Sequence, residues 1–176
     1  IFENIRCGAA RKGFESNQAQ EKGNVIRGIY SWDKIHTLYS SGQTGKMQAG
    51  SYTIDGGNIA GACIRLFDIR ESGWYATNVS NLFAESIGTI GSITTGDSYP
   101  NYQPTSIKSC VFHFAPKSVA GDQELLFCNS QYIKFEDDLF RYYGSKDTLR
   151  MRGWATFENC FFSGAINNIN NGFIFK

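Results

Sequence analysis

The sequence predicts an all-β fold, a parallel β-helix in which short strands coil around a common axis. Three observations lead to this prediction. A phenylalanine-rich phrase recurs at intervals of 29, 28 and 22 residues, short β segments alternate with Gly, Asn and Ser, and the 176 residues include 19 Gly but only 3 Pro. Repeats of about 20 to 50 residues are typical of solenoids and propellers. Many Gly with few Pro indicates tight turns rather than disorder.

The recurring phrase defines the expected rungs of the coil. Each copy ends in an apolar residue followed by a phenylalanine, at Phe83, Phe112, Phe140 and Phe162. A polar or small pair comes just before, and a further apolar residue leads the last three copies, at Ile107, Phe135 and Phe157. On rungs about 4.8 Å apart, the apolar positions would stack inside the coil. The polar pairs would form a corner, because Asn and Asp tolerate the left-handed backbone conformation.

The expected strands follow one another along the chain as short β segments, at 24–32, 50–55, 62–69, 73–79, 89–95, 106–114, 124–130, 132–137 and 172–176. Residues 11–22 are the one helix-like stretch, and they lack a continuous apolar stripe. The alternative fold is a β-sandwich, whose hairpins would use turns such as "DGG" at 55–57 and "NNG" at 170–172. Because the chain begins and ends in strand-like segments, we expect the single domain of residues 1–176 to be a fragment of a longer polypeptide.

Composition argues against several classes of function. The net charge is +1 with no basic patch, so nucleic-acid binding is not predicted. No apolar run reaches about 18 residues, so membrane insertion is not predicted. The cysteines at 7, 63, 110, 128 and 160 form no C-x-x-C pair, which favours reduced packing residues. The two histidines are not near paired cysteines, and "GQTGK" at 42–46 is too short for a P-loop, so no metal or cofactor is predicted.

One column of charged residues is a candidate for glycoside chemistry, which needs two carboxylates flanking the scissile bond. Lys108, Glu136 and Glu158 each stand one residue after the leading apolar position, so strand alternation points them outward. Two carboxylates one rung apart repel, which raises the pKa of one and makes an acid/base pair possible. Lys108 would partly cancel this effect. The alternative interpretation is an ordinary surface charge ladder.

Two further segments contain candidate residues. The run "FEDDLFRYYGSKD" adds the catalytic candidates Asp138 and Asp147 and the sugar-binding candidates Arg141, Tyr142 and Tyr143. The segment "FDIRESGWYATN" offers Trp74 and Tyr75 for stacking on a sugar ring, and Lys108 is a further binding candidate. In the alternative interpretation Asp138 is a corner residue and Trp74 fills the core. "YSWDKIH" offers Trp32, Asp33 and His36, where a structural role for the histidine is favoured.

Three runs of the sequence are similar to a known family: "FENCFFSGAINNINNGFIF", "FENIRCGAARKGF" and "YTIDGGNIAGACIRLFDI". They resemble the right-handed β-helix of the pectin-lyase-like superfamily, and in their general residue pattern they look most like bacteriophage tailspikes and capsule depolymerases. The resemblance implies a homotrimer in the virion tail that binds a bacterial surface polysaccharide, capsule or O-antigen. It also implies cleavage of that glycan by hydrolysis or β-elimination. The alternatives are a non-catalytic receptor-binding or structural module of a viral tail fibre and an autonomous polysaccharide lyase.

Overall fold

The structure is a computed structural model that describes residues 1–16, 24–33, 35–41, 52–61, 63–70, 77–94, 105–114, 124–142, 150–163, 169–170 and 173–176. The described residues form parallel strands. In chain order these are β1 (Phe2–Cys7), β2 (Ala10–Ser16), β3 (Asn24–Ser31), β4 (Ile35–Ser41), β5 (Tyr52–Ile59), β6 (Cys63–Arg70), β7 (Thr77–Thr94), β8 (Thr105–Lys108), β9 (Val111–Phe114), β10 (Glu124–Glu136), β11 (Leu139–Tyr142), β12 (Arg150–Glu158), β13 (Phe161–Ser163), β14 (Ile169–Asn170) and β15 (Phe173–Phe175).

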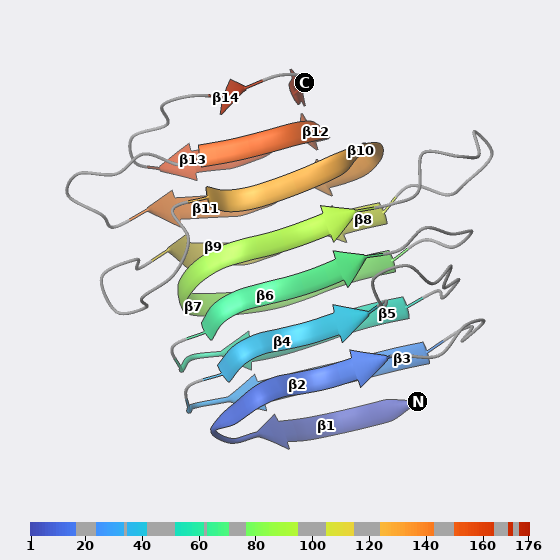
Figure 1. Cartoon of the computed structure of the whole chain (residues 1–176), viewed down its shortest axis with the longest axis vertical. Coiled ribbons are helices and arrows are strands. Elements are labelled where there is room, and N and C mark those ends of the chain that lie inside the picture. The colour runs from blue at the N-terminus through green and yellow to red at the C-terminus, as the bar shows by residue number, and fades with distance from the viewer. Residues whose placement is uncertain are drawn as a thin grey trace.

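The strands stack as the rungs of a parallel β-helix, which confirms the predicted fold class (Figure 1). Each strand pairs in parallel with the equivalent strand of the next rung, for example β1 with β3 and β3 with β5. The nearer strands in Figure 1 run to the right and the chain returns behind them as it climbs, so the coil is right-handed. The antiparallel hairpins of the alternative β-sandwich do not occur among the described strands.

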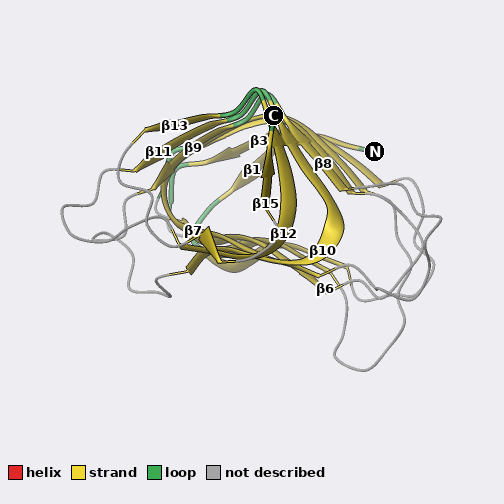
Figure 2. Ribbon diagram, turned by 90° about the horizontal axis from the view of Figure 1, so that it is seen from above, coloured by secondary structure: helices red, strands yellow, loops and turns green. Residues whose placement is uncertain are grey.

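Three sheets form the sides of the coil, as the view along the axis shows (Figure 2). Sheet 1 contains the first residues of β1, β3, β5 and β7, then β8, the last residues of β10 and β12, and β15. Sheet 2 contains the last residues of β1, β3 and β5, the middle of β7, and β9, β11 and β13. Sheet 3 contains β2, β4, β6, the end of β7, the starts of β10 and β12, and β14.

A column of residues in the left-handed backbone conformation forms the corner between sheets 1 and 2, as the polar pairs predict. The positive-φ residues of this corner, with φ between 52° and 73°, are Asn4, Gly28, Gly56, Asn81, Ser109, Asp137 and Asn159. Gly and Asn adopt this conformation with least strain, and Asp also tolerates it. The "DGG" segment at 55–57 is a corner of the coil within β5 and not a hairpin turn. It resembles a hairpin turn in the sequence because both structures need a residue with positive φ.

The predicted stacking is confirmed in the C-terminal half of the core. Phe135 and Phe157 are register partners whose ring centroids lie 4.9 Å apart, and the Phe140 and Phe162 rings stack at 4.7 Å. Such aromatic pairs contribute about 0.5–1.5 kcal/mol each beyond their area burial. Earlier rungs fill the equivalent positions of sheet 1 with aliphatic side chains, at Ile26, Ile54, Val79 and Ile107.

One sequence-based expectation is wrong in detail. Phe83 does not lie in the Phe112 column: it pairs with Val111, while the buried Ala84 pairs with Phe112. Phe83 faces outward, where its ring meets His113 edge-on at 5.2 Å. The helix-like stretch at 11–22 contains the end of β2, because Ala10–Ser16 pairs with β4. Residues 17–22 lie outside the described part of the chain.

Candidate functional site: a charge ladder on sheet 1

The outward face of sheet 1 carries one charged or polar side chain per rung, aligned by the strand register. We call this column the outer ladder; its members are Glu3, Arg27, Asp55, Ser80, Lys108, Glu136 and Glu158. The predicted alignment of Lys108 with Glu136 and of Glu136 with Glu158 is confirmed. Sequence separations differ between rungs, for example 24 residues between Glu3 and Arg27 and 28 between Lys108 and Glu136.

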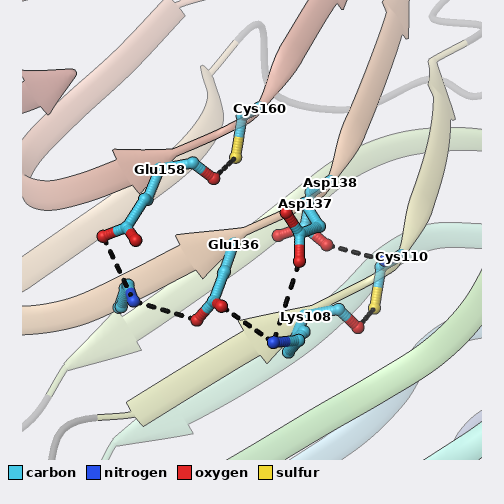
Figure 3. Close-up of polar contacts among 8 residues, drawn as sticks. Lys108, Cys110, Glu136, Asp137, Asp138, Glu158 and Cys160 are labelled. Atoms are coloured by element: carbon cyan, nitrogen blue, oxygen red, sulfur yellow. Dashed lines mark hydrogen bonds and ion pairs between the residues drawn. The ribbon is translucent and has the colours of Figure 1, made fainter. Parts of the chain in front are cut away.

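Two lysines hold the carboxylates of the outer ladder. Lys108 Nζ donates to Glu136 Oε1 at 2.8 Å and lies 3.7 Å from Asp137 Oδ2 (Figure 3). Lys134 Nζ lies 2.9 Å from Glu136 Oε2 and 3.3 Å from Glu158 Oε2. Lys134 stands two residues before Glu136, so strand alternation places both side chains on the outward face. The ammonium group of Lys134 therefore bridges two carboxylates on neighbouring rungs.

These contacts fix the charge of Glu136. Hydrogen bonds and charge attraction from Lys108 and Lys134 lower the pKa of Glu136 to about 2. The same hydrogen bonds raise the pKa of both lysines. Repulsion between Glu136 and Glu158 is thus outweighed at Glu136, whose pKa moves in the opposite direction from the one that an acid/base pair needs. An ionised Glu136 can bind a cation, accept hydrogen bonds or act as a nucleophile, but it cannot donate a proton as a general acid.

The N-terminal half of the outer ladder is paired in the same way. Arg27 Nη1 donates to Glu3 Oε1 at 3.2 Å. Asp55 Oδ1 accepts hydrogen bonds from Asn81 Nδ2 and Ser80 Oγ, both at 2.9 Å, and these bonds lower the pKa of Asp55. The ladder therefore presents both donors and acceptors along the sheet.

Asp138 lies inside the coil, not on the face that carries Glu136 and Glu158. It is 2% exposed and follows the left-handed Asp137, in the inner corner column between Cys110 and Cys160. The Cys110 amide donates to Asp138 Oδ1 at 2.7 Å, while Oδ2 has no hydrogen-bond partner within the described residues. Burial raises the pKa of Asp138 to about 7. A glycan on the outer surface cannot contact this carboxyl group, so we do not retain it as a catalytic candidate.

The neighbouring cysteines are packing residues, as the sequence indicates. Cys110 is buried, Cys160 is half-buried, and both are free thiols. Each donates to the carbonyl oxygen two residues earlier, at Lys108 and Glu158. Burial raises the pKa of Cys110 to about 12 and that of Cys160 to about 11. Neither thiol forms a reactive thiolate at neutral pH.

The remaining sequence-predicted residues do not join the outer ladder in the described structure. Arg141 belongs to sheet 2, where it is aligned with His113 and Ser163. Trp74, Tyr75, Tyr143 and Asp147 lie outside the described residues, as does the side chain of Tyr142. Lys134, which the sequence offers only as a cation or base for a β-elimination, lies beside this column and contacts both Glu136 and Glu158. Its position two residues before Glu136 is the signal that could have linked it to the column.

Comparisons with models of protein families, with curated proteins and with solved structures find no match for this chain. Within the described residues no group of three or more His, Cys, Asp or Glu side chains could hold a metal ion. No helix in the described part of the chain is long and apolar enough to span a membrane. Function is therefore inferred from the geometry of the coil and its outer surface.

Proposed function

We propose that the protein is a tailspike-type or tail-fibre β-helix module of a virion tail that binds a bacterial surface polysaccharide, capsule or O-antigen, along sheet 1. The observation that supports this proposal is the outer ladder, in which successive rungs present a hydrogen-bonding side chain at the same register. A polysaccharide repeats its hydroxyl and carboxylate groups along one direction. Successive sugar units can therefore contact successive rungs, which lie about 4.8 Å apart.

The electrostatics of the outer ladder favour binding over cleavage. Glu136 is ionised and held by Lys108 and Lys134, and Lys134 also contacts Glu158. Charged side chains fixed in this way offer hydrogen bonds to sugar hydroxyls without first having to be ordered. We therefore place the receptor-binding role first.

Depolymerisation is the second candidate, and one observation favours it. Glu136 and Glu158 are direct register partners on adjacent rungs, a spacing near the roughly 5 Å between the two carboxyl groups of retaining glycosidases. In that reaction the ionised Glu136 would be the nucleophile and Glu158 the acid/base. In a β-elimination, Lys108 and Lys134 would neutralise the uronate carboxylate.

A homotrimer is part of the proposal, and the outer face of sheet 2 supports it. In the C-terminal half of the coil an apolar column runs along this face, formed by Phe83, Val111, Leu139 and Phe161. Phe161 is 62% exposed. Phe83, Val111 and Leu139 are partly exposed, and an aligned apolar column of this kind suits a protein interface. Sedimentation of the wild type and of Phe161→Asp should then give a trimer and a smaller species, respectively.

The function is tested by screening the chain against purified capsular and O-antigen polysaccharides. We expect one glycan to bind, and Lys134→Ala to weaken that binding, while Lys12→Ala on β2 of sheet 3 leaves it unchanged. New reducing ends or unsaturated uronates in the same samples would move the depolymerase to first place. If no surface polysaccharide binds, the proposal fails.

A further inference from the structure

The end of β3 and the turn after it display two exposed aromatic side chains on the N-terminal part of the coil. Trp32 is 62% exposed and Tyr30 is 38% exposed. Tyr30 lies on the outward face of sheet 2, where its register partners are Arg6 on the previous rung and Asn58 on the next. The Arg6 guanidinium carbon lies 5.6 Å from the centroid of the Trp32 ring. Arg6 therefore contacts the Trp32 ring, and it shares an outward register column with Tyr30 and Asn58 on the next two rungs.

The backbone that carries Trp32 is held firmly in place. We call residues 31–33 the tryptophan turn. The amides of Ala60 and Gly61 donate to the Ser31 carbonyl oxygen at 2.9 and 3.2 Å, and Ser31 Oγ donates to the Asp33 carbonyl at 3.2 Å. A Cβ at Gly61 would lie only 2.6 Å from the Trp32 carbonyl carbon, so the next rung packs directly against this turn. The exposed indole thus stands on a preorganised turn rather than on a loose loop.

The described residues of the neighbouring rungs leave the indole uncovered. Gly8 and Ala9 follow Cys7 on one rung, and Ala60 and Gly61 follow Ile59 on the other, beside Trp32 and Asp33. These residues have no side chain that extends over the ring. Arg6 is a described residue that contacts the ring, and most of the indole surface remains open to solvent.

We propose that the tryptophan turn, with Arg6, Tyr30 and Asn58, is a second saccharide-binding site, distinct from the outer ladder and specific for a pyranose unit. Aromatic faces stack on the C–H surface of a pyranose ring. Arg6 supplies several N–H donors that suit a sugar carboxylate or vicinal hydroxyls, and the Asn58 amide offers a donor and an acceptor. The inference rests on the proposed function and names the place on sheet 2 where a sugar unit stacks.

The test uses the full chain and oligosaccharide fragments of the polysaccharide found in the screen, which removes effects of multivalent binding. We expect Trp32→Ala to weaken fragment affinity about tenfold or more in calorimetric titrations, and Trp32→Phe to retain part of it. Phe2→Ala is the matched control: Phe2 is 53% exposed on the first rung, but it pairs with the buried Ile26, so it belongs to the inner column at the end of the coil and not to the outer ladder. Circular dichroism melting curves check that each variant is folded.

The outcomes separate the two proposals. If the wild type binds a fragment and Trp32→Ala binds equally well, the tryptophan turn is not a saccharide site, and the proposed function stands. If Phe2→Ala weakens binding as much as Trp32→Ala does, the loss is not specific and the site is also rejected. If the wild type binds no surface glycan, both the site and the proposed function fail.

Discussion

Replacing Asp138 with asparagine should stabilise the protein at neutral and alkaline pH, and this stabilisation should disappear in acid. The Asp138 carboxyl group lies between Cys110 and Cys160 inside the coil, where Oδ1 accepts a hydrogen bond from the Cys110 amide and Oδ2 has no partner within the described structure. Burial raises its pKa from 3.8 to about 7. The unfolded chain therefore releases this proton at lower pH than the folded protein does.

The sign and size of the effect follow from proton linkage. Between pH 4 and pH 7 the unfolded state binds fewer protons than the folded state, so the free energy of unfolding falls as pH rises. Each pKa unit corresponds to about 1.36 kcal/mol, so the free energy of unfolding of the wild type is about 4 kcal/mol lower at pH 8 than in acid. Below pH 3.8, the pKa of Asp138 in the unfolded chain, the carboxyl group is protonated in both states and no stability is lost.

The new amide side chain in Asp138→Asn keeps an oxygen for the Cys110 amide and carries no charge. Its nitrogen replaces the unpartnered Oδ2, and a buried unsatisfied donor costs about 1–3 kcal/mol. The variant should therefore be about 1–3 kcal/mol more stable than the wild type at pH 8 and less stable at pH 4. The difference between the two proteins should change by about 4 kcal/mol across this range.

Urea denaturation at pH 4, 5.5 and 8 measures this difference directly, because the other titrating groups contribute equally to both proteins. Asp137→Asn is the control, since Asp137 is the exposed neighbour on the same corner. A difference between wild type and Asp138→Asn that stays constant across the three pH values would refute the reasoning.

Three further changes test the core, the coil geometry and the outer ladder. Phe135→Ala removes a fully buried ring that stacks on Phe157, and should cost about 3–5 kcal/mol in urea denaturation; a loss below about 1 kcal/mol would contradict the stacked core. Gly91→Ala should lower the melting temperature sharply, because Gly91 has φ +107° and a Cβ there would collide with the Phe67 carbonyl oxygen; an unchanged melting temperature would contradict this packing. Lys134→Ala should raise the pKa of Glu136 above its value of about 2, measured by NMR titration of the carboxyl carbon, with little change in stability; an unmoved pKa would show that Lys134 does not hold Glu136.

Much of the fold can be read from local chemistry. Phenylalanines at a regular offset from polar pairs predict stacked rungs, and the stacking of Phe135 on Phe157 and of Phe140 on Phe162 confirms them. The predicted register is wrong at Phe83. This residue lies one position closer to its left-handed corner residue than Phe112 does, so the small Ala84 takes the inner position instead. Because Ala84 does not continue the phenylalanine repeat, the sequence pattern does not identify it as the inward-facing residue.

The alternation of side chains along a strand places Lys108, Glu136 and Glu158 on one outward column, so this part of the candidate site needs no coordinates. The alternation stops at the left-handed corner, where Asp137 stays outside and Asp138 turns inward. Sequence cannot tell these adjacent aspartates apart, because their positions depend on the backbone conformation of a single residue. The Lys134 bridge and the open face of Trp32 likewise depend on residues from other rungs. Only the stacking of rungs brings Lys108 to Glu136, Lys134 to Glu158 and Arg6 to Trp32.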